Sequence, residues 1–175
     1  ADVKERIAVR KQNQVLIDRF QPTKKVGKLL MFDDNTQSFV VQNPNTRTDL
    51  YYYNQLVDFE LLEDGESITK GGLGRAVAGG LLFGGVGAIV GGVTGKKKTK
   101  GVCNSMQIKL TLRNSLWPTV YLPFVTSATK TNGLIYKNAY RTAQEALSAL
   151  QLAVDQVENA QAAAQPANTP SGADE

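Results

Sequence analysis

The sequence predicts an α+β fold, in which a small antiparallel β-sheet or partial barrel carries a glycine-rich insertion and is followed by a long C-terminal helix. Three observations predict it. Short apolar runs separated by turn pairs fill residues 25–63 and 105–125, as expected of strands. Glycine is concentrated between these two blocks, in residues 71–95. From Gly133 onward the apolar residues recur with a helical period.

The first 21 residues are predicted to form a helix. They contain neither glycine nor proline, and Pro22 ends the segment. Their apolar residues make a ragged stripe, which leaves two interpretations open: the helix lies against the domain, or it binds a partner. The stripe comprises Val3, Ile7, Val15, Leu16 and Phe20.

Residues 25–33 and 36–42 predict a β-hairpin, because two apolar runs flank the turn pair Asp34-Asn35. Residues 50–54 and 55–63 are expected to be further strands, and the tyrosines at 51–53 are expected to pack in the sheet. The acidic segment 63–66 is interpreted as a solvated turn. In the strand 55–63, alternation would put one set of side chains on one face (Leu56, Asp58, Glu60) and the next set on the other (Val57, Phe59, Leu61).

The second strand block follows the insertion. Residues 105–113 alternate apolar and polar side chains, which is typical of a half-buried strand in an antiparallel sheet. Residues 118–125 are expected to return beside them, and their two prolines indicate an edge position. Cys103 is interpreted as a small apolar residue that opens a strand, with a thiol of lowered pKa as the alternative.

The C-terminal helix shows apolar residues at alternating spacings of four and three. This seam predicts a helix docked on the open face of the sheet, with a coiled-coil partner as the alternative. We therefore divide the chain into a helix at 1–21, a β-domain with its C-terminal helix at 22–160, an insertion at 70–100 and a disordered tail at 161–175. The seam comprises Tyr136, Tyr140, Ala143, Leu147, Leu150, Val154 and Val157.

Strands, an insertion, more strands and one final helix resemble the layout of pleckstrin-homology-like modules. This likeness lies in the order of elements alone, and it carries no function by itself.

The insertion reads as a glycine zipper, since eleven of the sixteen glycines fall in 25 positions and small residues recur every fourth place. On a helix, residues four apart share a face, so another backbone can approach closely. We expect the packing ridge to be Gly72, Ala76, Gly80, Gly84, Ala88 and Gly92. The lipid-facing residues would be Leu81, Leu82, Phe83, Val86, Ile89 and Val90, and the headgroup-binding residues Lys70, Arg75, Lys96, Lys97, Lys98 and Lys100.

A topological argument restricts how this zipper could meet a membrane. One crossing would put the two strand blocks on opposite sides of the bilayer, where they could not pair. A helical hairpin avoids this, because two arms of ten residues, each about 15 Å long, could dip into one leaflet and return. Two alternatives stay open: the run is a structural loop in a soluble protein, or it joins subunits by zipper packing.

The composition offers few side chains that are suited to catalysis. The chain has no histidine, which removes the commonest general base and metal ligand, and its single cysteine excludes an internal disulfide and a cysteine-built zinc site. The net charge of +4 is mild and partly local to the lysines, so no nucleic-acid partner is expected. We expect no cofactor and no enzymatic activity. No secretory leader is visible, which indicates the cytoplasm or the cytoplasmic face of a membrane.

Three segments carry a resemblance to a family of uncharacterised bacterial and phage-associated proteins. They are DFELLEDGESITKGGLGRAVAGGLLFGGVGAIVGGVTG at 58–95, KKKTKGVCNSMQIKL after it, and LIYKNAYRTAQEALSALQ in the C-terminal helix. Members of that family carry, in some cases, a small cysteine-rich zinc domain or a short C-terminal oligomerisation motif. This chain lacks the cysteine-rich domain. The resemblance supports the extent of the domain and implies no activity.

Together these observations predict a non-enzymatic module that associates with a membrane or assembles with itself through the glycine zipper. Its expected partners are membrane lipid, including anionic lipid, and further copies of the same chain. The alternative is a soluble protein-interaction domain that binds its partner through the C-terminal heptad helix, with the glycine run as a structural loop.

Overall fold

A computed structural model describes residues 2–43, 47–73 and 101–164. The chain begins with helix α1 (Val3–Asp18) and continues through β1 (Lys24–Val26), β2 (Leu30–Asp33), β3 (Ser38–Gln42) and β4 (Thr48–Tyr52). A 3-10 helix η1 (Tyr53–Gln55) leads into β5 (Leu56–Glu63) and β6 (Glu66–Gly72). After the insertion come β7 (Val102–Cys103), β8 (Met106–Leu112), β9 (Thr119–Val125), β10 (Thr129–Lys130) and helix α2 (Leu134–Ala164).

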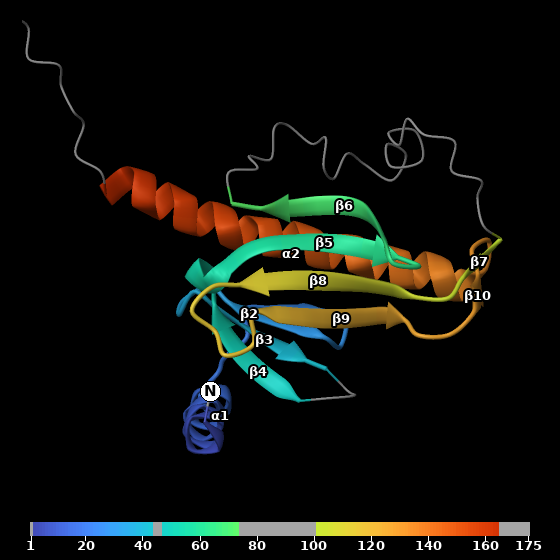
Figure 1. The fold of residues 1–175 in the computed structure, drawn as a ribbon. Coiled ribbons are helices and arrows are strands. Elements are labelled where there is room, and N and C mark those ends of the chain that lie inside the picture. Colours follow the sequence, from blue (N-terminus) through green and yellow to red (C-terminus); the bar gives the residue numbers. More distant parts are fainter. Residues whose placement is uncertain (1, 44–46, 74–100, 165–175) are drawn as a thin grey trace, which may run out of the picture.

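The first sheet is an antiparallel meander in the order β1-β2-β3-β4 (Figure 1). The predicted hairpin is present as β2 and β3, joined by the turn at Asp34 and Asn35. The run 25–33 was expected to be one strand, but it divides into β1 and β2. Gly27 has a φ of +55° there, so the chain reverses direction in a tight turn that favours glycine.

The second sheet has the order β6-β5-β8-β9 and is antiparallel throughout. Strand β5 precedes the insertion and β8 follows it, yet they pair along their length, from Leu56 beside Leu112 to Glu63 beside Met106. Every second residue of β8 is buried, as the alternation predicted. Strand β9 lies at an edge, where the missing N–H of Pro123 is tolerated. The expected fold class is confirmed: the described strands form open antiparallel sheets, and a long C-terminal helix covers them.

One prediction about β5 is wrong. Leu56 was placed on the same face as Asp58, but Leu56 is fully buried and shares the core with Phe59 and Leu61. The pairing with β8 shifts register between Leu56 and Asp58, so an extra residue there turns Leu56 to the inner face. Strict alternation cannot foresee such a bulge.

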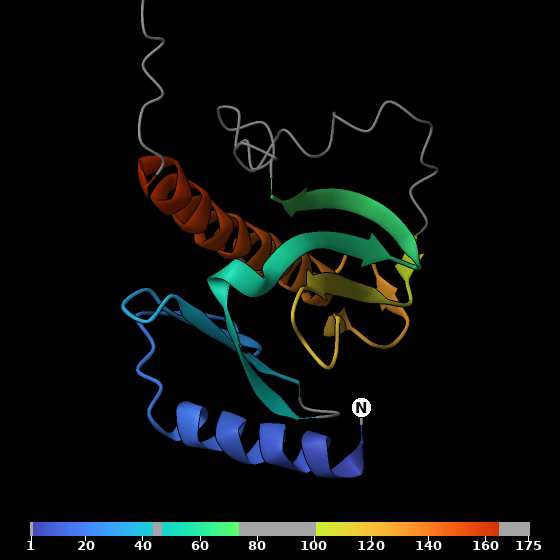
Figure 2. The same ribbon diagram turned by 60° about the vertical axis from the view of Figure 1, so that its left-hand side comes forward.

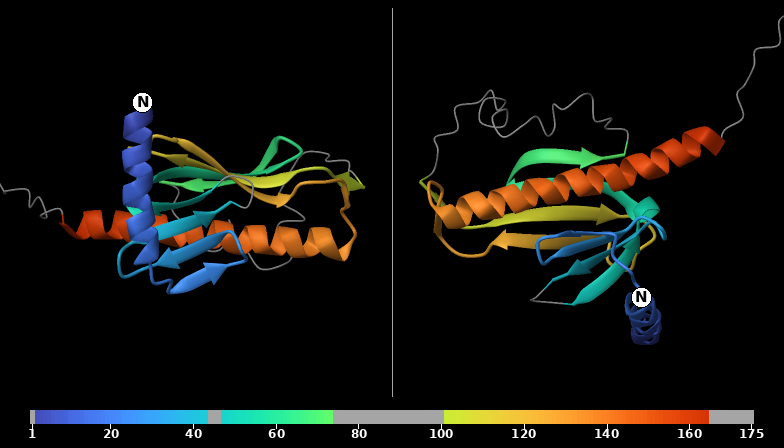
Figure 3. Two further views of the ribbon diagram at one scale, coloured as in Figure 1. Left: turned by 90° about the horizontal axis from the view of Figure 1, so that it is seen from below. Right: turned by 180° about the vertical axis from the view of Figure 1, so that it is seen from behind.

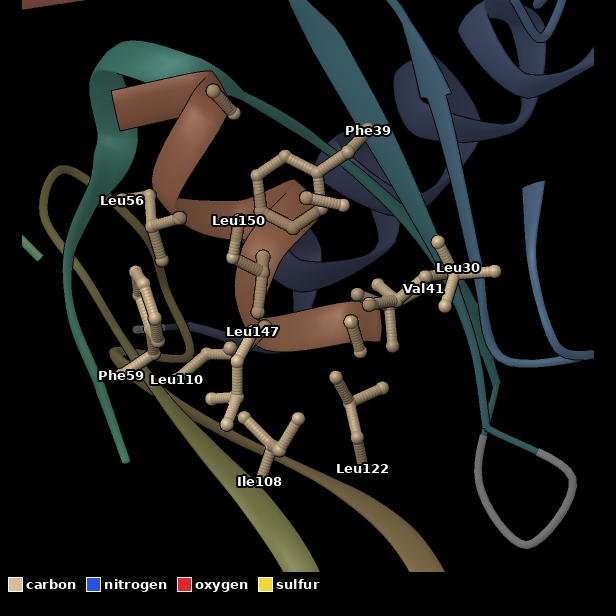
Figure 4. Close-up of a cluster of buried hydrophobic side chains, with 14 of the residues drawn as sticks. Leu30, Phe39, Val41, Leu56, Phe59, Ile108, Leu110, Leu122, Leu147 and Leu150 are labelled. Atoms are coloured by element: carbon tan, nitrogen blue, oxygen red, sulfur yellow. The ribbon is translucent and has the colours of Figure 1, made fainter. Parts of the chain in front are cut away.

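Helix α2 crosses both sheets and supplies one side of the core (Figure 3). Leu147 and Leu150 are buried among side chains from both sheets, including Phe39 and Phe59 (Figure 4). The heptad seam therefore faces the sheets, and the docked interpretation is confirmed over the coiled-coil one. The helix also continues to Ala164, so the expected boundary of the tail at residue 161 is too early; residues 165–175 lie outside the described part.

Helix α1 stands apart from this core at the free edge of β4 (Figure 2). None of its residues is buried, and Val3, Ile7 and Val15 are exposed. Its specific attachment is polar. The Asn13 side chain donates to an Asp49 carboxylate oxygen at 2.9 Å and accepts from the Leu50 backbone N–H at 3.0 Å. The helix thus lies against the domain at the edge of a strand, with only Leu16 and Phe20 of its apolar stripe half-buried.

Within the described ranges, no helix is both long enough and apolar enough to cross a membrane.

Candidate functional site

The insertion leaves the domain from β6, where the chain is held by α2. Gly72 pairs with Asp58 of β5 and has a φ of +133°, a conformation that favours glycine. Its backbone N–H donates to the side-chain oxygen of Gln151 at 3.0 Å, and Gln151 itself is fully buried. The Leu73 N–H then donates to the Val57 carbonyl at 3.0 Å. These bonds fix the departure point of the insertion on the core.

Close packing explains the glycine that precedes it. A Cβ at Gly71 would lie 2.3 Å from the ring of Phe59 and 2.9 Å from the Gln151 side-chain oxygen. Both distances are far below van der Waals contact, so only a residue without a side chain fits between β5 and α2. Gly71 and Gly72 therefore serve the domain itself.

The chain returns at β7, where it is held by the turn between β5 and β6. Asp64 accepts the backbone N–H groups of Asn104 and Ser105 at 2.8 and 3.0 Å, and its own N–H donates to the Ser105 carbonyl at 2.8 Å. Cys103 is fully buried beside this turn, and burial, followed by the charges of Glu63 and Asp64, raises its pKa to about 11. The acidic turn and the cysteine thus have structural roles at the return point.

The two attachment points lie at opposite ends of β5 (Figure 1). Gly72 is the partner of Asp58, whereas Met106 is the partner of Glu63. Five residue steps separate these positions on β5, which corresponds to about 17 Å along the strand. The ends of the insertion are at least this far apart, because Leu73 bonds to Val57 and Asn104 bonds to Asp64, one residue beyond each position. The insertion therefore begins after β6 and ends before β7, and its two anchored points are bonded to opposite ends of the β5 strand.

The outer face of the sheet between these points carries a charge ladder. Glu60 of β5 is flanked by Lys70 of β6 at 3.5 Å and by Lys109 of β8 at 3.2 Å. A hydrogen bond from Ser67, then one from Lys109 and the charges of both lysines, lower the pKa of Glu60 against the opposing effect of its partial burial. Asp58 precedes Glu60 by two residues on the same face of β5, so two carboxylates and two lysines share this part of the outer face.

Comparison with known proteins identifies the architecture. Residues 18–126, more than half of the chain, match the family described as "Glycine zipper containing PH domain". The chain belongs to this family. The match includes both strand blocks and the insertion between them, so the expected glycine zipper and the pleckstrin-homology-like layout are confirmed together.

Two curated relatives of this glycine-zipper PH domain come from a phage and a prophage. One is the "Immunity protein" of Bacillus phage SPbeta, 30% identical over 73 residues that cover 42% of this chain and 36% of the relative. The other is the "SPbeta prophage-derived uncharacterized membrane protein YomJ" of Bacillus subtilis (strain 168), also 30% identical over 73 residues, covering 42% of this chain and 32% of the relative. The chain spans about a third of each relative, and both agree with the expected phage association. No solved structure matches.

Most of the predicted site residues lie outside the described residues, and they stay predictions. They are Arg75, Ala76, Gly80, Leu81, Leu82, Phe83, Gly84, Val86, Ala88, Ile89, Val90, Gly92, Lys96, Lys97, Lys98 and Lys100.

Two predicted site residues are described. Gly72 was expected to open the helical packing ridge, but it lies in β6 with an extended partner strand, so that expectation is corrected. The side chain of Lys70 is 57% exposed on the outer face, where Glu60 pairs with it. Its expected role at lipid headgroups stays a prediction.

Sequence reasoning missed the residues that anchor the insertion. Gln151 interrupts an apolar helix between Leu150 and Ala153, and a polar residue beside such a seam is the signal that could have identified it. Asp64 was interpreted only as part of a solvated turn. Its role as acceptor for two backbone N–H groups depends on residues 40 positions away and leaves no local pattern.

Proposed function

We propose that this glycine-zipper PH domain is a non-enzymatic module that associates with the surface of a membrane and packs its insertion there. The observation that carries the proposal is the continuous pairing of β5 with β8 across the insertion. Because both attachment points are bonded to β5 or to the turn that follows it, the insertion has to leave and re-enter on the same side of any bilayer that it contacts.

The separation of the attachment points suggests an orientation. Two ends at least about 17 Å apart along β5 can both meet a headgroup layer only when the strand lies along the membrane surface. Two arms of about 15 Å would then reach into one leaflet of a hydrocarbon core that is about 30 Å thick. The lysines at 96, 97, 98 and 100, which follow the glycine run in the sequence, favour anionic lipid.

The descriptions of the matching family and of one relative support membrane association. The family is described by its glycine zipper, and one relative carries the words "membrane protein" in its name. The absence of histidine from the sequence and the raised pKa of Cys103 support the non-enzymatic part. We further propose that zipper packing joins copies of the chain, that nucleic acid is no partner, and that the module acts in the cytoplasm or at the cytoplasmic face.

Liposome co-sedimentation tests the proposal. The intact chain is compared with Gly80→Leu/Gly84→Leu, which fills the predicted packing ridge, on vesicles with and without anionic lipid. The matched control is Gly79→Leu/Gly85→Leu, which adds the same side chains off that ridge. Added leucine alone would strengthen partition into lipid, so weaker binding by the ridge variant only would indicate that backbone packing is required.

We expect the intact chain and the control to bind anionic vesicles, and the ridge variant to bind several-fold more weakly. Measuring the mass of each variant in solution shows whether the ridge also joins subunits. Failure of the intact chain to sediment with any vesicle would contradict the membrane proposal. An equal loss of vesicle binding in both variants would contradict the predicted positions of the packing ridge.

A further inference from the structure

A compact corner of the domain forms where β7, β10 and the start of α2 meet (Figure 1). Lys130 of β10 pairs with Val102 of β7, and the Thr131 N–H donates to the Gly101 carbonyl at 3.2 Å. The Gly133 N–H then donates to the Lys130 carbonyl at 3.0 Å, so the turn into α2 is bonded to the same ribbon. These contacts hold the exposed side chains described next on one rigid unit.

Three large aliphatic side chains are exposed at this corner. Leu134 and Ile135, in the first turn of α2, are 73% and 74% exposed, the highest values for large apolar residues in the described ranges. Val102, on the neighbouring ribbon, is 42% exposed. Elsewhere along α2 only Leu152 is comparably exposed, and it stands alone. We call Val102, Leu134 and Ile135, with the lysines at 130 and 137, the apolar corner.

The charges around the apolar corner are suited to an anionic surface. Lys130 and Lys137 flank Leu134 and Ile135 in the sequence, and both are exposed. The first turn of α2 contains no acidic residue, although the positive end of a helix dipole favours one there. The carboxylates of the neighbouring turn keep their charge. Glu63, which accepts the Tyr136 hydroxyl at 2.9 Å, and Asp64, which accepts two backbone N–H groups, are half-buried, whereas Glu66 and the two lysines are exposed.

We propose that the apolar corner is a lipid-contact surface, which inserts its aliphatic side chains at the boundary between headgroups and acyl chains while its lysines bind lipid phosphates. The inference rests on the proposed membrane association and assigns it a second point of contact, separate from the glycine zipper. The chain enters this corner directly from the lysine run at 96–100. A membrane contact at the insertion therefore continues into the corner without a break in the chain.

A bilayer fits this surface better than a protein partner does. Three aliphatic side chains cover far less than the roughly 800 Å² that each partner contributes to a stable protein interface. A small apolar cluster flanked by two exposed lysines is instead a composition that binds anionic interfaces, where burial and headgroup attraction add.

Vesicle binding by the full chain tests the inference, with phosphatidylcholine vesicles compared with vesicles that also contain phosphatidylserine. Leu134→Gln/Ile135→Gln removes the aliphatic contacts, with Leu152→Gln on the same helix as the matched control.

Lys130→Gln/Lys137→Gln removes the charges. Its control is Lys4→Gln/Lys11→Gln on α1, because both of these lysines are exposed and α1 lies far from the corner (Figure 1). We expect the two corner variants to partition roughly tenfold more weakly onto anionic vesicles, and the controls to match the native chain.

Amide hydrogen exchange of residues 129–138 in the native chain gives a second measurement that needs no substitution. Anionic vesicles should slow exchange there. If both corner variants bind vesicles like the native chain, and amide exchange at 129–138 is unchanged by vesicles, the apolar corner is not a lipid-contact surface. The zipper proposal would be unaffected by that result. A change in oligomeric mass rather than in vesicle binding would also overturn it, in favour of a protein contact. If the native chain binds no vesicle, the inference and the proposed function fail together.

Discussion

At the scale of single residues, the position most restricted by packing is Gly71. A side chain there would collide with the ring of Phe59, which is 1% exposed and surrounded by core residues. Gly101, at the other end of the insertion, has open space around the corresponding position. The two glycines that flank the insertion therefore form a natural pair for comparison.

We predict that Gly71→Ala lowers the free energy of unfolding by about 1–3 kcal/mol, because the buried ring has to move in a packed core. Gly101→Ala should leave the free energy of unfolding within about 0.5 kcal/mol of the native value, as is usual for open surface positions. Urea unfolding followed by circular dichroism measures both. Equal stability of the two variants would show that Phe59 relaxes freely.

Asp34 is a second informative residue, because its carboxylate joins three parts of the fold. It accepts hydrogen bonds from Gln156 of α2 at 3.0 Å, from the Tyr53 hydroxyl at 2.9 Å and from Thr23 at 3.1 Å. The Gln156 and Tyr53 bonds, in that order, lower the pKa of Asp34, and its slight burial opposes them. Folding therefore favours the charged form of this carboxyl group.

This lowered pKa predicts a dependence of stability on pH. A carboxyl group with a lowered folded-state pKa stabilises the fold above its unfolded-state pKa of about 4, and that stabilisation is lost as pH falls through the folded-state value. We expect Asp34→Asn to flatten the decline in unfolding free energy between pH 5 and the acid range, measured by urea titrations. Gln156→Ala should flatten it in part, whereas Gln161→Ala, an exposed glutamine on the same helix, should not. Parallel pH curves for all variants would contradict this role of Asp34.

At the scale of elements, periodic patterns were sufficient wherever one face meets the core and one meets solvent. Strand β8 and the seam of α2 are both of this kind, and the structure places their apolar residues inward. The seam could not distinguish a sheet from a coiled-coil partner, because both bury the same stripe. The structure distinguishes the two possibilities, because α2 packs on the open face of the two sheets.

The elements that the sequence did not predict correctly share a physical cause. The tight turn at Gly27, the bulge after Leu56 and the pairing of β6 with β5 all depend on contacts between segments rather than on a local period. Strand β6 illustrates this most clearly. Its glycines continue the composition of the insertion, so Gly72 was counted as the start of a helix, although Gln151 and Asp58 hold it in a strand.

The same limit applies to the candidate site. The sequence located the insertion and the basic residues around it, because composition changes abruptly there. It could not find the anchors, because Asp64 and Gln151 bond to residues far along the chain. Nor could it find the apolar corner, because the exposure of Leu134 depends on how the whole domain packs.

At the scale of the whole molecule, the domain and its insertion are separable in the sheet topology. All pairing in the second sheet is made by residues up to Gly72 and from Met106 onward, and the returning ribbon begins at Val102. None of these described pairings is made by residues 74–100. Removing it should leave the fold in place, provided that the replacement spans the distance between the two attachment points.

We predict that replacing residues 74–100 with a 12-residue Gly/Ser linker retains the fold and abolishes zipper-dependent membrane binding. Such a linker has a root-mean-square span of about 19 Å and a maximal reach of roughly 40 Å, which suits attachment points that lie at least about 17 Å apart along β5. The matched control starts the same linker at residue 71 with two serines, which puts side chains into the closely packed positions of Gly71 and Gly72, and it should be less stable by about 1–3 kcal/mol.

Thermal unfolding and vesicle co-sedimentation together give the result. A linker chain that unfolds near the native midpoint yet stays in the supernatant would locate most of the membrane affinity in residues 74–100. Weak residual binding, confined to anionic vesicles and removed by Leu134→Gln/Ile135→Gln, would be the separate contribution of the apolar corner. Native-level binding by the linker chain would contradict the proposal, because the domain would then hold the membrane without its zipper.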